Sequence, residues 1–239
     1  MTVWHVYHDP PMSGARNMAI DHALARSITD GTAALRLYEW SEPTVSLGRN
    51  EPARGRGGAV VRRPTGGRAV LHRSELTYAV AVPARALGGP RALYRAVSEA
   101  LVEGLRLLGA EVTLAPDGKT LRPDAGPCFD VPAEGEVVAG GGKLVGSAQA
   151  RMGGALLQHG SILIEDDQST LGSASTARPL RALVEDVTIE DVRDAVVRGF
   201  QRRLDGTSWR PSAYDEALLA MADRLEAERY GNDEWTWRR

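Results

Sequence analysis

Residues 62–72 read RRPTGGRAVLH, a pair of glycines between two short β-type segments. Glycine lets the backbone adopt unusual dihedral angles and lets a ligand approach its N–H groups, so Gly66 and Gly67 favour a turn that contacts a ligand. Arg63 and Arg68 flank this turn, and guanidinium groups bind a carboxylate, a phosphate or a thioester oxygen. The alternative is an ordinary β-turn with solvated arginines. Strand–turn–strand geometry also differs from the helix-opening glycine motif of dinucleotide-binding folds.

Helical and extended patterns are mixed along the rest of the chain. Apolar residues at three- to four-residue spacing predict helices, and short β-branched or aromatic runs ending at Pro, Gly or Asn predict strands. The expected helices are 13–30, 90–108, 188–204 and 211–229, and the expected strands are 34–40, 44–47, 59–63, 68–72, 76–82, 111–114, 136–139, 144–149 and 156–164. Because strands and helices do not alternate strictly, we expect an α/β or α+β fold built on a mixed sheet. We expect a single domain over residues 1–239, with residues 206–239 as a helical tail.

The composition excludes several classes of function. The chain has 239 residues, a formal net charge of −2 and 43% hydrophobic residues. A nearly neutral chain has no overall field that attracts nucleic acid or an anionic membrane, so neither is an expected partner. No apolar run reaches the ~18 residues of a transmembrane helix, and the N-terminus lacks a secretory signal pattern. A single cysteine excludes an internal disulfide and a cysteine-rich zinc site; we expect a cytoplasmic protein without a bound metal.

Lysine is rare in this chain, since the 29 basic residues are 27 arginines and two lysines. Lys143 follows three glycines, residues 140–142, which are expected to join strands 136–139 and 144–149 as a hairpin. The stretch fails the P-loop pattern, because it lacks the earlier glycine and the Ser or Thr after the lysine. A lysine beside the small residues that follow can polarise a carbonyl or stabilise a thiolate; the alternative is an exposed hairpin lysine.

Cys128 lies in a loop rich in Pro, Asp and Gly. A loop position gives a thiol the access and the charged neighbours that reactivity needs, whereas a small buried hydrophobic residue is the alternative. His159 could pair with that thiol as a base, but a structural histidine at a strand bend is the favoured interpretation.

Four stretches, in order along the chain, resemble the biotin/lipoate protein ligase superfamily and, within it, the lipoate-protein-ligase-A-like branch. They are 63–72, 75–78 (ELTY), 143–149 (KLVGSAQ) and 158–163 (QHGSIL), and the resemblance spans roughly residues 12–200. It implies a mixed, largely antiparallel sheet packed by helices. It also implies an eight-carbon acyl substrate, octanoyl or lipoyl, in an apolar tunnel.

The resemblance implies a role for each matched residue. In the octanoyltransferases of this superfamily, a cysteine on the loop before the lysine hairpin carries the acyl group as a thioester. Cys128 matches that cysteine, and Lys143 matches the lysine that contacts the acyl carbonyl and favours the thiolate. The implied substrate-binding residues are Arg63, Thr65, Gly66, Gly67, Arg68, Ala69, His72, Gly146, Ser147, Ala148, His159 and Gly160. We therefore expect the sulfur and the ammonium to face one pocket, with the glycine turn on its wall.

The chain departs from the superfamily pattern at two points. An acidic residue commonly follows the motif's histidine, but Arg73 follows His72 here. Lipoate ligases commonly carry an additional C-terminal domain, for which this sequence leaves no room. The second departure favours the transferase, or a ligase whose accessory domain is a separate polypeptide.

Three functions remain as hypotheses. An octanoyltransferase moves octanoyl from acyl carrier protein to Cys128, and then to a lysine of a lipoyl domain (glycine cleavage H protein or 2-oxoacid dehydrogenase E2), without a cofactor. A lipoate ligase uses ATP and Mg²⁺ through a lipoyl-adenylate, and the cysteine is then incidental. The third is a non-catalytic acyl-binding module. Candidate docking residues for the acidic carrier protein are Arg54, Arg56, Arg62 and Arg63.

Overall fold

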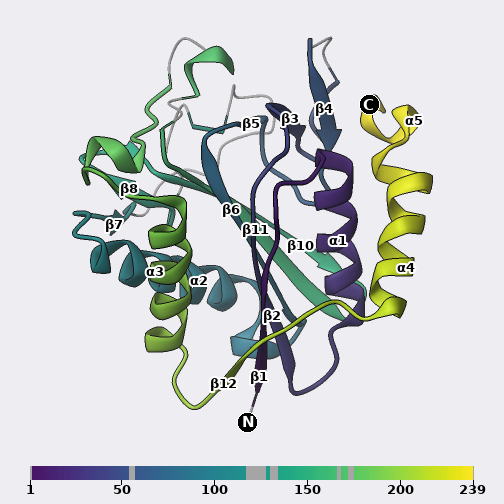
Figure 1. Cartoon of the computed structure of the whole chain (residues 1–239), viewed down its shortest axis with the longest axis horizontal. Helices are drawn as coiled ribbons and strands as arrows, with labels where there is room; N and C mark the ends of the chain where they lie inside the picture. The colour runs from purple at the N-terminus through teal and green to yellow at the C-terminus, as the bar shows by residue number, and fades with distance from the viewer. Residues whose placement is uncertain are drawn as a thin grey trace.

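The computed structural model describes residues 2–53, 57–116, 128–129, 134–165, 168–171 and 175–238. A six-stranded sheet forms its centre, with the strands in the order β10-β11-β6-β2-β1-β12 (Figure 1). These strands are β1 Val3–His8, β2 Thr32–Tyr38, β6 Glu75–Pro83, β10 Val145–Met152, β11 Ala155–Leu163 and β12 Ser208–Pro211. Neighbours from β10 to β2 pair antiparallel, whereas β1 pairs parallel with β2 and β12. The expected mixed, largely antiparallel sheet is confirmed.

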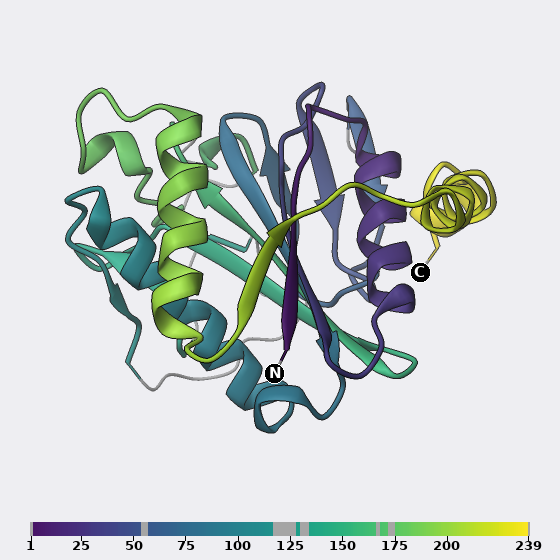
Figure 2. The same cartoon turned by 60° about the horizontal axis from the view of Figure 1, so that its bottom comes forward.

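Helices cover both faces of this sheet (Figure 2). Helices α2 Pro90–Leu107 and α3 Ile189–Arg203 lie on one face, and α1 Gly14–Ser27 lies on the other with α4 Glu216–Leu225 outside it. Side chains alternate accordingly along β2: Leu35 and Leu37 join the core under α2 and α3, whereas Ala34 and Tyr38 join the core under α1. This two-residue period is that of a strand buried on both faces.

The helix ends have local causes. Ser13 caps α1 by accepting a hydrogen bond from the backbone N–H of Arg16. Thr188 and Asp191 form a capping box at the start of α3, as the sequence predicts. Pro90 occupies the first turn of α2, where its missing N–H costs nothing. No helix in the described ranges is long and apolar enough to cross a membrane.

Two three-stranded sheets flank the central one and carry the glycine turn and Lys143, whereas the stretches 75–78 and 158–163 lie in β6 and β11 of the central sheet. The first contains β3 Thr44–Leu47, β4 Ala59–Arg62 and β5 Val70–His72, in the order β4-β3-β5. The second contains β7 Thr113–Leu114, β8 Val137–Ala139 and β9 Gly142–Lys143. The glycine turn of residues 66–67 connects β4 to β5, and Lys143 ends β9.

The expected glycine hairpin is confirmed, but the extent and pairing of its second strand differ from the prediction. The strand 136–139 does not pair with 144–149; β8 pairs with the two-residue β9, and β10 pairs with β11 in the central sheet. The turn is tighter than expected because Gly140 and Gly141 both adopt positive φ and reverse the chain by themselves.

The C-terminal segment also differs from the expected helix 211–229. It begins with strand β12, which extends the parallel edge beside β1, and α4 starts only at Glu216, after the Asp215 cap. The five residues 226–230 then form a π-helical turn, and α5 is the short segment Asp233–Thr236. Strands β1 and β12 were not predicted, because neither shows clean alternation of apolar and polar residues.

Candidate active site

The thiol of Cys128 and the ammonium of Lys143 meet in the structure. Lys143 Nζ donates hydrogen bonds to Cys128 Sγ at 3.2 Å and to the Cys128 carbonyl oxygen at 2.8 Å. Lys143 is 1% exposed and Cys128 is 9% exposed, so solvent screens this contact little. The expected juxtaposition is confirmed, and an exposed hairpin lysine is excluded.

The hairpin of β8 and β9 explains how Lys143 reaches the thiol. Lys143 lies opposite Val138 in the antiparallel pair, and Glu136 is two residues before Val138 on the same face. Lys143 Nζ therefore also donates to Glu136 Oε1, at 2.7 Å. The sequence analysis did not identify Glu136. Side chains two residues apart on a strand lie on the same face, so the residue two positions before Val138, the partner of Lys143, could have been predicted to face the lysine.

The Cys128 side chain lines a mainly apolar pocket. One wall comes from the small β4-β3-β5 sheet and the other from β6, β10 and β11 of the central sheet. The lining residues are Met18, Tyr38, Trp40, Ser46, Arg63, Gly67, Val70, His72, Thr77, Cys128, Gly146, Ser147, Ala148, His159, Gly160 and Ser161. Such a pocket is suited to an unbranched apolar chain whose reactive end lies at the sulfur.

Two glycines make room in this pocket. A Cβ on Gly146 would lie 2.9 Å from Phe129 Cζ and 3.4 Å from Cys128 Sγ, so any side chain there displaces the cysteine loop. Gly67 has φ of +86°, a left-handed conformation that glycine adopts without strain, and its Cβ would lie 2.9 Å from Arg63 Nη2. The backbone at Gly67 is therefore part of the pocket wall, as expected.

Arg63 is built into the wall rather than solvated. Its guanidinium donates to the carbonyl oxygens of Ser46, Gly66 and Arg68. Burial lowers the pKa of this guanidinium, while attraction to an ionised Cys128 acts in the opposite direction. No carboxylate among the described residues forms an ion pair with Arg63, so its positive charge acts on the pocket.

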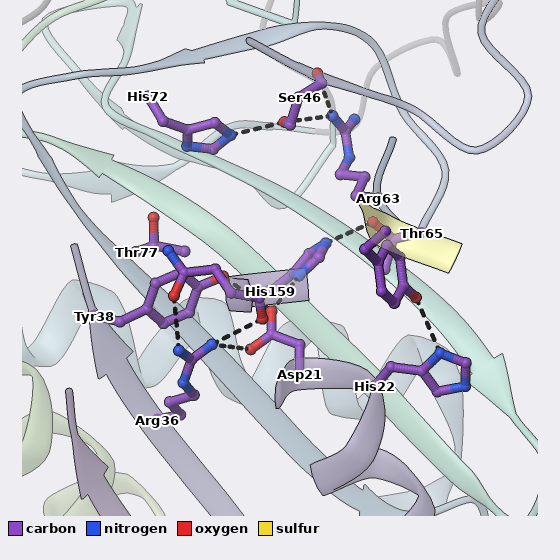
Figure 3. A network of polar contacts seen from close by, with 12 residues as sticks. Asp21, His22, Arg36, Tyr38, Ser46, Arg63, Thr65, His72, Thr77 and His159 are labelled. Atoms are coloured by element: carbon purple, nitrogen blue, oxygen red, sulfur yellow. Dashed lines mark hydrogen bonds and ion pairs between the residues drawn. The ribbon is translucent and has the colours of Figure 1, made fainter. Parts of the chain in front are cut away.

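His159 belongs to a buried polar network and does not pair with Cys128 (Figure 3). Its Nε2 shares a hydrogen bond with Thr65 Oγ1 at 2.6 Å, and its Nδ1 shares one with Asp21 Oδ2 at 2.8 Å. Burial lowers the pKa of His159 although Asp21 acts against this. The favoured interpretation of a structural histidine is confirmed, and the alternative of a base for the thiol is wrong, because a carboxylate and a hydroxyl occupy both ring nitrogens.

Asp21 links this network to the core of the sheet. Arg36, fully buried, donates to Asp21 at 2.7 Å and to Asp9 at 2.6 Å. Burial alone raises the pKa of the Asp21 carboxyl, but the Arg36 guanidinium and His159 hold that pKa below its usual value. Asp21 is therefore an ionised anchor that fixes the orientation of the His159 ring at the pocket wall.

A second chain of polar groups fixes His72. Its Nε2 contacts Ser46 Oγ at 2.7 Å, its Nδ1 contacts Glu75 Oε1 at 2.6 Å, and Trp40 stacks on its ring at 3.8 Å between centroids. The Trp40 indole N–H donates in turn to Thr77. These contacts fix the rings of His72 and Trp40 in one orientation, and both rings line the pocket.

The remaining predicted substrate-binding residues support the pocket from behind. Arg68 donates to the Cys128 carbonyl oxygen at 3.3 Å, and Ala69 accepts from the Cys128 N–H at 3.1 Å. Thr65 is fully buried and Gly66 lies at the edge, outside the set of lining residues. No cluster of three or more His, Cys, Asp and Glu side chains in the described segments is placed to hold a metal ion.

Known proteins resemble this chain over its whole length. Residues 13–201 match the lipoyl protein ligase A/B catalytic domain family. The octanoyltransferase LipM of Kyrpidia tusciae is 38% identical, with 100% of each chain covered. The solved structure of Ta0514, a putative lipoate protein ligase from T. acidophilum with bound lipoic acid, superposes with a TM-score of 0.83 at 26% identity, covering 99% of both chains. A lipoate-protein ligase A bound with ATP superposes with a TM-score of 0.84 at 25% identity and 99% coverage of each. The chain thus belongs to the lipoyl protein ligase A/B catalytic domain family.

Proposed function

We propose that the chain is an octanoyltransferase of lipoate biosynthesis, which moves an octanoyl group from acyl carrier protein through a Cys128 thioester to a lysine of a lipoyl domain. The observation that carries the proposal is the 3.2 Å contact between the sulfur of the single cysteine and a buried ammonium, at the wall of an apolar pocket. The full-length similarity to LipM octanoyltransferases supports the same reaction.

The first step forms a bond between Cys128 Sγ and the octanoyl carbonyl carbon. The thioester bond to the donor breaks, and the donor sulfur leaves as a thiolate that takes a proton from solvent. Lys143 stabilises the attacking thiolate through its ammonium, and an ammonium beside the sulfur is also placed to stabilise the negative charge that develops on the carbonyl oxygen.

The second step returns the sulfur to its starting state. A neutral amine of the acceptor lysine attacks the thioester carbonyl, an amide bond forms, and the bond to Cys128 Sγ breaks. The thiolate that leaves is again stabilised by Lys143, and the amine loses its extra proton. The reaction needs no nucleotide and no metal ion, because the thioester already stores the acyl group in an activated form.

A lipoate ligase remains the second candidate, because Arg63 presents a positive charge without an ion-paired carboxylate in the described chain and the ATP-bound ligase A has the same fold. A ligase would require ATP and Mg²⁺ and would use the pocket for a carboxylate and a phosphate. A non-catalytic acyl-binding module would hold the acyl group without turnover.

One assay separates these candidates. The purified chain is incubated with a lipoyl domain and either octanoyl-carrier protein alone, or lipoate with ATP and Mg²⁺, and the mass of the lipoyl domain is followed. The transferase predicts octanoylation in the first mixture without ATP. Modification only in the second mixture would instead identify a ligase, and modification in neither would leave the binding module.

A further inference from the structure

The C-terminal helix α5 lies beside strand β4, which leads into the glycine turn of the pocket wall (Figure 1). Arg62, fully buried at the end of β4, donates to the carbonyl oxygens of Thr236 and Arg238, and its own carbonyl accepts from the Trp235 indole. Arg62 lies four residues before Gly66, the first glycine of the turn at the pocket wall. Three hydrogen bonds to Arg62 therefore hold the segment 235–238 beside the pocket wall.

Three arginines gather at this edge: Arg49, Arg229 and Arg238, here called the tail arginine cluster. The guanidinium groups of Arg229 and Arg238 each lie 3.5 Å from the ring of Trp235. Arg238 Nη2 donates to the carbonyl oxygen of Arg49 at 3.0 Å. The Arg49 backbone N–H donates to Thr65 O at 2.8 Å, which places the cluster next to the glycine turn of the pocket.

The cluster brings three guanidinium groups together at one edge, although the exposed residues Asp233 and Glu234 lie on the neighbouring helix α5. Some arginines elsewhere pair with carboxylates, as Arg16 does with Asp223 and Arg193 with Glu39, whereas Arg63 donates to backbone carbonyl oxygens. None of the three cluster arginines forms an ion pair in the described part of the chain. Partial burial, together with the neighbouring guanidinium groups, lowers the pKa of both Arg229 and Arg238. Like charges held together at this cost indicate a surface for an anionic partner.

The surface has further features of a docking site. The Arg49 side chain is exposed, and Trp237 beside the cluster is 40% exposed. Arginine and tryptophan are the residue types that contribute most to binding at protein interfaces. Of the arginines first considered for docking, Arg62 and Arg63 are buried, and Arg54 and Arg56 lie outside the described residues.

We propose that the tail arginine cluster docks the acidic acyl carrier protein that donates the octanoyl group. This rests on the proposed function and names the surface that serves its first step. The donor is an acidic protein, and the phosphopantetheine arm that bears the acyl thioester carries a phosphodiester charge. Charge complementarity therefore assigns the cluster to the donor.

Arg49→Glu tests this assignment, because the Arg49 side chain is exposed and only its backbone takes part in the fold's hydrogen bonds. Arg151→Glu is the matched control: it makes the same charge change at an exposed site on β10, about 17 Å along the strand from Gly146. The rate of thioester formation is measured with octanoyl-carrier protein and with octanoyl-N-acetylcysteamine, a neutral donor without protein or phosphate. Transfer from preloaded enzyme to a lipoyl domain is measured separately.

Arg49→Glu is expected to slow loading from the carrier protein about tenfold at low salt. The deficit should fall below about twofold at about 0.5 M salt, where surface charges are screened. Loading from the neutral donor, transfer to the lipoyl domain, and every rate of Arg151→Glu should stay within about twofold of the unsubstituted protein. Equal loading of Arg49→Glu and the unsubstituted protein from the carrier protein would overturn the docking assignment. So would a defect confined to the lipoyl-domain step. If the unsubstituted protein forms no thioester with either donor, the proposed function falls and the docking assignment with it.

Discussion

Lys143 Nζ lies 3.2 Å from Cys128 Sγ and 2.7 Å from Glu136 Oε1, so one buried ammonium contacts both a thiol and a carboxylate. The carboxylate holds the ammonium in place and balances its charge in the resting state. The third contact, to the Cys128 carbonyl oxygen, fixes the cysteine loop relative to the lysine. Glu136 is thus a positioning residue for the pair, although it has no part in the bond changes.

Replacing Lys143 with methionine should abolish fast loading while the chain still folds. Methionine keeps the volume but removes the charge that stabilises the thiolate, so thioester formation should fall about a hundredfold or more. The free energy of unfolding should fall by about 3 kcal/mol, because Glu136 loses its cation in a buried site. Urea unfolding and stopped-assay mass spectrometry measure the two effects.

A double variant separates stability from chemistry. Adding Glu136→Gln to Lys143→Met removes the buried uncompensated charge, so part of the lost stability should return while loading stays slow. Recovery of the loading rate in the double variant would show that the lysine acts only through folding, against the role assigned to it.

Gly146→Ala should impair both loading and stability. The added methyl group meets Phe129 at 2.9 Å and pushes the cysteine loop away from Lys143, which predicts at least a tenfold slower thioester formation and about 1–3 kcal/mol of destabilisation. Gly154→Ala, where nothing lies within 4 Å of the added atom, is the matched control and should be neutral. A Gly146→Ala variant as fast as the control would mean that the loop tolerates displacement.

His22 should make the protein less stable at acidic pH. Burial lowers the pKa of His22 to about 4, with Arg229 and Arg26 acting in the same direction. Between about pH 6.5 and pH 4 the unfolded chain binds a proton at this position that the folded chain does not bind. The free energy of unfolding should therefore decrease by about 3 kcal/mol as pH falls through this window.

The His22→Gln variant isolates this effect, because glutamine can still contact Tyr230 but does not titrate. Its free energy of unfolding, measured in urea at several pH values, should vary less between about pH 6.5 and pH 4 than that of the unsubstituted protein. Identical pH profiles of the two proteins would contradict the lowered pKa.

The sequence predicted the sheet and the partners Cys128 and Lys143, but not what supports them. The glycine turn, the lone cysteine and the rare lysine are visible because each is an unusual residue in its position. Asp21 and Glu136 are ordinary acidic residues in helix and strand patterns, and only the tertiary contacts with Arg36 and Lys143 give them a role. Strand β12 was missed because its pairing with β1 depends on the whole sheet rather than on local alternation.

The tail arginines illustrate the same limit. The chain contains 27 arginines, so composition alone cannot show which arginines form an exposed cluster and which are buried and hold backbone carbonyl groups, as Arg62 does. Arg62 and Arg238 are 176 residues apart in sequence and meet only because the C-terminal turn packs against β4. Long-range pairing of this kind leaves no periodic pattern in the sequence.

Intact-protein mass spectrometry shows whether Cys128 carries the octanoyl group. The chain is incubated with octanoyl-carrier protein in the absence of ATP. We expect a mass gain of one octanoyl group that hydroxylamine removes, and no gain in Cys128→Ala. An unchanged mass in the unsubstituted protein, or the same labile gain in Cys128→Ala, would contradict this expectation.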